Sequence, residues 1–283
     1  MKILWITSFR SFKKVSRDTD IQLKFLKEIA KISNVDLCIT QFNEKKIKSN
    51  VKKFYKKCYY KNYDTSKKNF KYSQSIVLEN GLEVLKKNPL KYDAFIWSTA
   101  DIVFSKNFKR IINNIKNNSI CTVFPNIHIY KRKQIDYTKI NFGLDFFLFK
   151  ISENKINLLY KYNRECPNYD WGCYEHFLFS MHKALNLHLI NLRYHLKLFK
   201  YDNEENTFKK TRNSQILSWK KNQKNLIKFL NKRNLSIFYA KGSFFYIALK
   251  LFKISDISPT MLVIYGRLFI KFFILLIKKF TNH

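Results

Sequence analysis

The chain has 283 residues, and its hydrophobic share of 46% with 17% aromatic residues excludes a globally disordered protein. Its formal net charge of +34 at pH 7 is typical of proteins that meet nucleic acid or an anionic membrane. Lysine rises together with Asn, Ile, Phe and Tyr along the whole chain, and no nucleic-acid-binding motif is found. Compositional bias with a basic face towards anionic lipid is therefore favoured over nucleic-acid binding. Five cysteines without a CxxC pair indicate neither a disulfide framework nor a zinc site, and fit a reducing compartment.

The N-terminal part predicts a βαβ unit. Residues 2–7 form an apolar strand, a polar loop with Arg10 and Arg17 follows, a helix covers about 19–32, and 35–40 form a second strand. This order implies a parallel pair joined by a right-handed crossover. The first apolar run is too short, and too soon followed by Arg10, for a secretory signal, so we expect a cytoplasmic protein.

The next segment is polar and then helical. Residues 43–72 are dominated by Lys, Asn and Tyr, with one short strand expected at 58–60. A helix is predicted at 73–87, with Asn80 and Gly81 in its middle. Glycine there costs about 1 kcal/mol relative to alanine, which indicates either a close approach of another group or ordinary helix packing.

A single carboxylate follows the most strand-like stretch of the chain. Residues 94–97 read as a buried central strand, 98–100 are small, Asp101 comes next, and a helix is expected at 106–116. Ligands bind at the carboxyl ends of strands in open α/β sheets. Asp101 is thus either a ligand-binding residue or an ordinary turn acid.

The alternation of strands and helices continues to about residue 192. The predicted elements are strands at 119–124 and 187–192, a Gly turn, an acid and a strongly apolar strand within 141–149, helices at 153–162 and 173–185, and loops at 126–140 and 166–172.

The C-terminal part is helical from about 208, and residues 257–280 are strongly apolar. Arg267, Lys271 and Lys278 fall on one face of that last helix. Its apolar side chains favour bilayer insertion by about 4 to 7 kcal/mol, and its central charges oppose it by a similar amount. A helix lying in the membrane interface is favoured over a span, and packing against the domain is the alternative.

This succession resembles the GT-A glycosyltransferases, of the type that builds bacterial surface polysaccharides. Residues 92–102 look like their DxD segment, 78–82 like the helix before it, and 170–175 like their acceptor-side acidic motif. The resemblance covers about residues 1–195. It implies an α/β fold with a single, Rossmann-related, mostly parallel sheet flanked by helices as the catalytic domain, and leaves 196–283 as a C-terminal helical extension.

The resemblance also implies a donor site and a metal. In that family a divalent ion, Mn²⁺ or Mg²⁺, bridges the diphosphate of the nucleotide sugar. Here Thr99 occupies the first acidic position of DxD, so Asp101 alone is left as a metal ligand. The expected donor-binding residues are Thr7, Arg10, Asn80 and Asp101, with Arg17 and Lys71 as further partners for the phosphates.

The catalytic and acceptor residues follow in the same way. For an inverting transfer, Glu175 is the first candidate for the base that deprotonates the acceptor hydroxyl, and Asp170 is the second. The alternative for Glu175 is simple complementarity to a helix dipole. The expected acceptor-binding residues are Asp145, Tyr169 and Trp171, and His188 or His195 is a further candidate metal ligand.

Together these features predict a glycosyltransferase, peripheral at the inner face of the cytoplasmic membrane. It would move a sugar from a nucleotide-diphosphate sugar to a lipid-linked surface glycan such as lipopolysaccharide or capsule. One alternative is a nucleotidyltransferase on the same fold, against which the lack of a Gly-rich loop near the N-terminus speaks. The other is a basic scaffold that binds a membrane surface or nucleic acid without catalysis. Inversion or retention stays open.

Overall fold

The structure is a computed structural model, and it describes the following residues: 1–8, 25, 27–29, 32–42, 58–63, 73–100, 102–104, 108–124, 126–129, 135–141, 144–166, 173–196, 198–201, 212–240 and 251. The helix expected at 19–32 is described only in part. The apolar helix expected at 257–280 lies outside the described residues. No helix among those described is long and apolar enough to cross a membrane.

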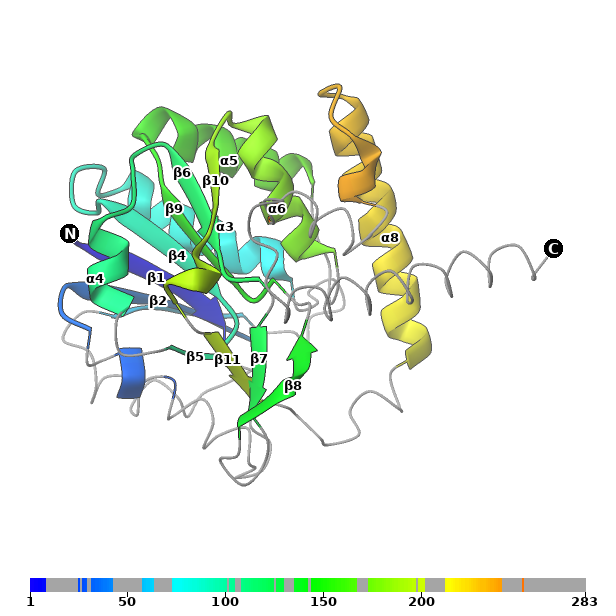
Figure 1. Ribbon diagram of the computed structural model, residues 1–283. Coiled ribbons are helices and arrows are strands. Elements are labelled where there is room, and N and C mark those ends of the chain that lie inside the picture. Colours follow the sequence, from blue (N-terminus) through cyan, green and yellow to red (C-terminus); the bar gives the residue numbers. More distant parts are fainter. Residues whose placement is uncertain are drawn as a thin grey trace.

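The centre of the fold is a seven-stranded sheet in the order β10-β6-β9-β4-β1-β2-β3 (Figure 1). All neighbours are parallel except β9, which runs antiparallel to both β4 and β6. The predicted α/β fold with a mostly parallel sheet is thereby confirmed. The strands are β1 (Ile3–Ser8), β2 (Val35–Phe42), β3 (Cys58–Tyr63), β4 (Ala94–Ser98), β6 (Ser119–Thr122), β9 (Phe146–Lys150) and β10 (His188–Asn191).

A second, four-stranded sheet was not predicted. It has the order β5-β11-β7-β8 and consists of β5 (Ile102–Phe104), β7 (Asn126–Ile129), β8 (Ile135–Asn141) and β11 (Leu198–Tyr201). The prediction of a loop at 126–140 is therefore wrong. The partner of β7 on one side is β11, about 70 residues further on, and such a distant pairing leaves no local signal in a basic, aromatic segment. The expected helical extension from 196 also begins with a strand.

Helices cover both faces of the main sheet. Four of them form one layer: α3 (Gln74–Lys86), α5 (Glu153–Glu165), α6 (Tyr174–Ala184) and α8 (Arg212–Asn231). The short α4 (Phe108–Asn113) packs on the other face together with Phe25 and Ile29. The strands alternate accordingly, since in β1 Leu4 and Ile6 join one core and Ile3 and Trp5 the other. The result is three layers, with two cores separated by the sheet (Figure 1).

The glycine in the middle of α3 has a packing explanation. A β-carbon at Gly81 would lie 2.1 Å from Cδ1 of Ile6 in β1. No side chain fits into that gap, so glycine lets α3 approach the sheet closely. The sequence left two interpretations of this glycine, a close approach of another group and ordinary helix packing. In the structure one contact, the packing of α3 against Ile6, accounts for both.

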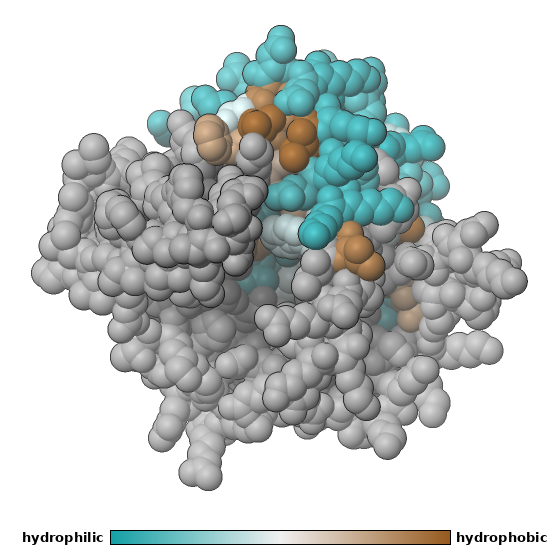
Figure 2. Space-filling model, turned by 90° about the vertical axis from the view of Figure 1, so that its right-hand side faces the viewer, coloured by the Kyte–Doolittle hydropathy of each residue, from teal (hydrophilic) through white to brown (hydrophobic). Residues whose placement is uncertain are grey.

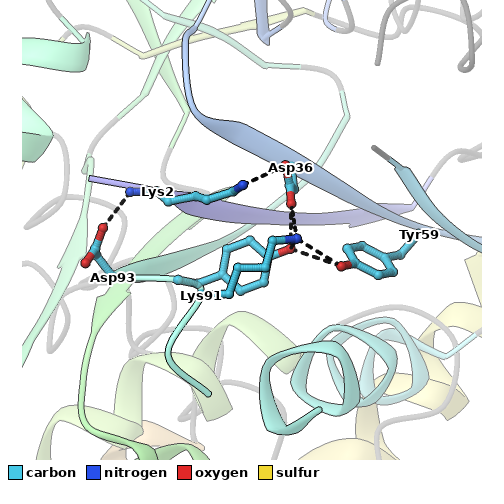
Figure 3. A network of polar contacts seen from close by, with 6 residues as sticks. Lys2, Asp36, Tyr59, Lys91 and Asp93 are labelled. Carbon is cyan, nitrogen blue, oxygen red and sulfur yellow. Dashed lines mark hydrogen bonds and ion pairs between the residues drawn. The ribbon is translucent and has the colours of Figure 1, made fainter. Parts of the chain in front are cut away.

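A charged network joins the strands at the amino edge of the sheet (Figure 3). The Nζ of Lys91 donates to Asp36 Oδ2 at 2.6 Å and lies 4.7 Å from the centre of the Tyr92 ring. Tyr92 donates to the same carboxylate oxygen at 2.7 Å. Burial alone raises the pKa of Asp36, but these hydrogen bonds and the charges of Lys91 and Lys2 outweigh it and lower that pKa. A network of hydrogen bonds and ion pairs between side chains therefore occupies the amino edge of the sheet.

Candidate functional site at the carboxyl edge of the sheet

The order in which the chain adds strands to the sheet reverses at β1. The chain places β2 and β3 on one side of β1 and then crosses to place β4 on its other side. In open α/β sheets the crevice at such a switch point is where ligands bind. Thr7 lies there, fully buried, and its Oγ1 donates to the carbonyl of Ser98 in β4 at 2.9 Å. The expected donor residue Thr7 is thus at the switch point, as its place at the end of the first strand implies.

Gln41 is a residue of this edge that the sequence interpretation missed. It lies near the end of β2, next to Thr40, which pairs with Ser8 of β1. Its side chain is fully buried, and neither its Oε1 nor its Nε2 has a hydrogen-bond partner among the described residues. A buried polar group without a partner costs about 1 to 3 kcal/mol. The available signal was a long amide near the end of a strand whose central residues, 37–39, are apolar.

Thr99 and Asp145 meet at the end of β4. Because β9 is antiparallel, its first residue, Phe146, pairs with Ser98. The backbone N–H of Thr99 donates to the carbonyl of Asp145 at 3.1 Å. The Thr99 hydroxyl is buried and has no partner in the described part of the chain, and Asp145 is only 3% exposed. The DxD-like segment and the Gly-x-Asp strand, both singled out from the sequence, are therefore neighbours.

Asn80 is the centre of a polar cluster on the α3 side of β2. Its Nδ2 donates to Thr40 Oγ1 at 2.9 Å. Its Oδ1 accepts from Lys61 Nζ at 2.9 Å and from Tyr63 Oη at 2.7 Å. The side chain is 4% exposed. Asn80 is thus held near the end of β2 by three hydrogen bonds, which fixes its orientation before any ligand binds.

Topology brings Glu175 to the same edge. The C-terminal end of α6 lies at the amino edge, since the carbonyl of Asn186 accepts from Asn118 beside the start of β6. The N-terminal end of α6 therefore points to the carboxyl edge, and the ring of Tyr174 lies 5.5 Å from that of Trp97 in β4. Glu175 is in the first helical turn and half-buried. A carboxylate in this position is favoured by the helix dipole.

The residue before this helix has an unusual backbone. Cys173 caps α6 with φ of 63°. The other non-glycine residues with positive φ in the described part are all asparagines, namely Asn34, Asn118, Asn186 and Asn234. Asparagine tolerates this region better than cysteine does. Strain of this kind clusters at functional sites, and here it lies two residues before Glu175.

The remaining expected site residues divide into two groups. His188 begins β10 beside Ser119, at the amino edge, so it is not a ligand at the carboxyl edge and that candidate was wrong. His195 is exposed and follows the short helix η1 (Leu192–Tyr194) beyond the end of β10. The expected residues that lie outside the described part of the chain are Arg10, Arg17, Lys71, Asp101, Tyr169, Asp170 and Trp171.

The described residues offer neither a metal cluster nor a reactive thiol. No group of three His, Cys, Asp or Glu among them is placed to hold a metal ion. All five cysteines are free thiols, and burial raises the pKa of each to about 12. A thiol with so high a pKa is a poor nucleophile at neutral pH.

The sequence matches no protein-family model and no curated protein. Among solved structures, the inositol-1-phosphate CTP transferase from T. maritima is similar with a TM-score of 0.42 and 9% identity, over 76% of this chain and 96% of that one. A nucleotide-diphospho-sugar transferase from Desulfovibrio desulfuricans has a TM-score of 0.38 and 10% identity, over 81% and 99% of the two chains. The Drosophila β-1,4-galactosyltransferase 7 in complex with manganese, UDP-Gal and xylobiose has a TM-score of 0.37 and 8% identity, over 73% and 67%. The fold class given above rests on the strand order itself.

Proposed function

We propose that this protein is a glycosyltransferase that moves a sugar from a nucleotide-diphosphate sugar to a lipid-linked surface glycan. The observation that carries the proposal is that two buried polar side chains near the switch point have no hydrogen-bond partner among the described residues. Gln41 and Thr99 stand at the carboxyl ends of β2 and β4, on either side of β1. Groups of this kind are costly in a free protein, and a polar ligand bound at this edge would supply their missing hydrogen bonds.

The donor would lie across the end of β1. We assign Thr7, Gln41 and Asn80 to the donor from their places near the carboxyl ends of β1 and β2, and Arg10 and Asp101 to the diphosphate on sequence grounds. Asn80 is already oriented by its own hydrogen bonds, so less entropy is lost when a ligand binds.

The acceptor would enter from the α6 side. Glu175 then takes the proton of the acceptor hydroxyl while the hydroxyl oxygen attacks the anomeric carbon of the donor sugar. The bond between that carbon and the diphosphate breaks. The nucleotide leaves as the diphosphate. Asp170 is the second candidate for this base. Asp145, Tyr169 and Trp171 are assigned to the acceptor, as a hydrogen-bonding acid and two stacking rings.

A divalent metal, Mn²⁺ or Mg²⁺, remains an expectation from the DxD-like segment. The described residues supply no cluster of ligands for it, so the ion would depend on Asp101 and on the oxygens of the diphosphate.

The expected place of action is the inner face of the cytoplasmic membrane. A lipid-linked acceptor sits at an anionic leaflet, which attracts a chain with a net charge of +34. The apolar, basic segment 257–280 is assigned to the membrane interface on its sequence.

The product of the reaction tests the proposal against its enzymatic rival. Protein, a lipid-linked glycan extract and one labelled nucleotide sugar at a time are incubated, and both labelled lipid and released nucleotide are measured. A glycosyltransferase yields glycosylated lipid and free nucleotide, and Glu175→Gln abolishes both. A parallel incubation contains a nucleoside triphosphate and a sugar phosphate. Release of pyrophosphate there, with no transfer of sugar to lipid in the first incubation, would instead make the protein a nucleotidyltransferase.

A further inference from the structure

Helix α8 exposes a continuous basic face. Its sequence from 212 to 233 contains no acidic residue. Side chains on one side of the helix recur at intervals of three and four residues, and those exposed on this side are Leu217, Lys220, Lys221, Lys224, Lys228, Asn231 and Lys232. Lysine thus covers a face about 18 Å long at 1.5 Å per residue.

The opposite face of α8 holds the helix firmly on the domain. Leu226, Phe229 and Leu230 are buried in the core formed with α5 and α6. Arg233 pairs with Glu165 at the end of α5, and its guanidinium lies 4.1 Å from the centre of the Tyr162 ring. The basic face is therefore presented outward from a fixed position. Figure 2 views the side of the molecule on which α8 lies, and hydrophilic side chains gather there with hydrophobic ones among them.

Few carboxylates of the described residues lie against this face. Glu165 serves Lys232 and Arg233. No carboxylate in the described part of the chain pairs with Lys220, Lys224 or Lys228. Concentrated charge of one sign attracts partners of the other.

Large apolar side chains flank the lysines. Leu217 lies on the same face, one turn before Lys220 and Lys221, and is 68% exposed. Phe238, in the short helix η2 (Ile237–Tyr239) after α8, is 56% exposed. Exposed leucine and phenylalanine beside lysine suit the boundary between lipid headgroups and acyl chains, because the lysine stems add apolar surface while their ammonium groups stay in water.

We propose that this outer face of α8 docks the protein on an anionic lipid bilayer. The charge complementarity is the argument for the partner, and the two exposed apolar side chains favour a lipid surface over a nucleic acid. The proposal deepens the function above, since it names a folded surface that would bring the carboxyl edge of the sheet to a lipid-linked acceptor. It does not depend on sugar transfer.

The test is vesicle binding by the full chain. Flotation is measured with vesicles of phosphatidylcholine alone and of phosphatidylcholine with phosphatidylglycerol, for the wild type and for K220Q/K221Q/K224Q/K228Q. Each lysine removed is expected to weaken binding to the anionic vesicles about fivefold, because one basic side chain near an anionic leaflet contributes that much. Leu217→Ser should weaken it further, while both variants keep the wild-type melting temperature.

A second quadruple variant controls for net charge. K86Q/K87Q/K116Q/K183Q removes four exposed lysines of other elements and should bind vesicles as the wild type does. Equal loss in both variants, or wild-type binding by the α8 variant, would overturn the proposal. The proposal would also be overturned if the α8 variant lost binding to an oligonucleotide but still bound the anionic vesicles. Donor binding, measured separately on the α8 variant, should be unchanged, so a failure of the glycosyltransferase proposal would be seen independently.

Discussion

Gly81 of α3 and Ile6 of β1 are in such close contact that a β-carbon at position 81 would lie 2.1, 2.5 and 2.9 Å from three side-chain carbons of Ile6. This contact sets the height of α3 above the sheet, and α3 carries Asn80. The position of Asn80 near the carboxyl edge therefore depends on the absence of a side chain at position 81.

Gly81→Ala should destabilise the protein by about 1 to 3 kcal/mol, because the cost of overpacking exceeds the gain in helix propensity. Chemical denaturation measures the change. In an Ile6→Ala background all three close carbons are gone, and the same substitution should be neutral or stabilising. An equal loss in both backgrounds would show that the contact with Ile6 is not the reason for this glycine.

Asn80→Ala should lower the free energy of unfolding by about 2 to 4 kcal/mol, since Thr40, Lys61 and Tyr63 all lose a partner. Asn80→Asp should retain most of the stability, because a carboxylate still accepts from Lys61 and Tyr63. If Asn80 contacts a donor diphosphate, however, this variant should bind the donor more weakly through charge repulsion. Asn88→Ala, which removes one bond to the carbonyl of Val84 in the same helix, is the matched control and should change little.

Gln41→Leu separates a ligand-binding role from a structural one. In the free protein the amide has no partner in the described part of the chain, so an apolar side chain of similar size should leave the melting temperature unchanged or raise it. Donor affinity should fall about tenfold, which corresponds to about 1.4 kcal/mol. Calorimetry checks both. A destabilised variant with normal donor affinity would make Gln41 a structural residue.

His176 should give the protein a sensitivity to mild acid. Burial lowers its pKa from 6.5 to about 4, and a hydrogen bond that the ring donates to the backbone of Tyr239 offsets this only in part. The unfolded chain binds a proton in that range and the folded protein does not, so stability falls as the pH drops from about 6.5 to about 4 and then levels off. The loss amounts to about 3 kcal/mol at 1.36 kcal/mol per pKa unit.

Melting curves between pH 7 and pH 4 test this. His176→Phe, which keeps a ring against Trp219, should flatten the profile over that window. His188→Gln, at an exposed position, is the control and should leave the slope as in the wild type. If the melting temperature of His176→Phe still falls with pH as in the wild type, the pH dependence comes from another group.

The parts of the fold that follow from local pattern could be predicted. Buried strands such as 94–97 and amphipathic helices such as 73–87 carry their own periodicity, and the βαβ order implies the parallel sheet. Strands β7 and β8 could not be predicted, because β7 is held between β8 and the distant β11.

The candidate site shows the same division. The place of Thr7 could be predicted, because the end of the first strand is recognisable in the sequence. Asp145 reaches the same edge only because β9 is antiparallel, which the sequence does not show, and the roles of both residues stay predictions. Gln41 was missed, since whether an amide is buried without a partner depends on neighbouring strands and not on its own segment. His188 was misplaced because a histidine at the start of a strand lies at the opposite edge from one at its end.

The most direct test of the central claim is a thermal-shift panel of UDP, GDP, CMP and dTDP sugars, with and without Mn²⁺, on the wild type, Asp101→Ala and Gln41→Leu. The account predicts that one class of nucleotide sugar raises the melting temperature of the wild type by several degrees and that both variants lose most of the shift. If no nucleotide sugar shifts the wild type, or if both variants respond as it does, the carboxyl edge of this sheet is not a donor site.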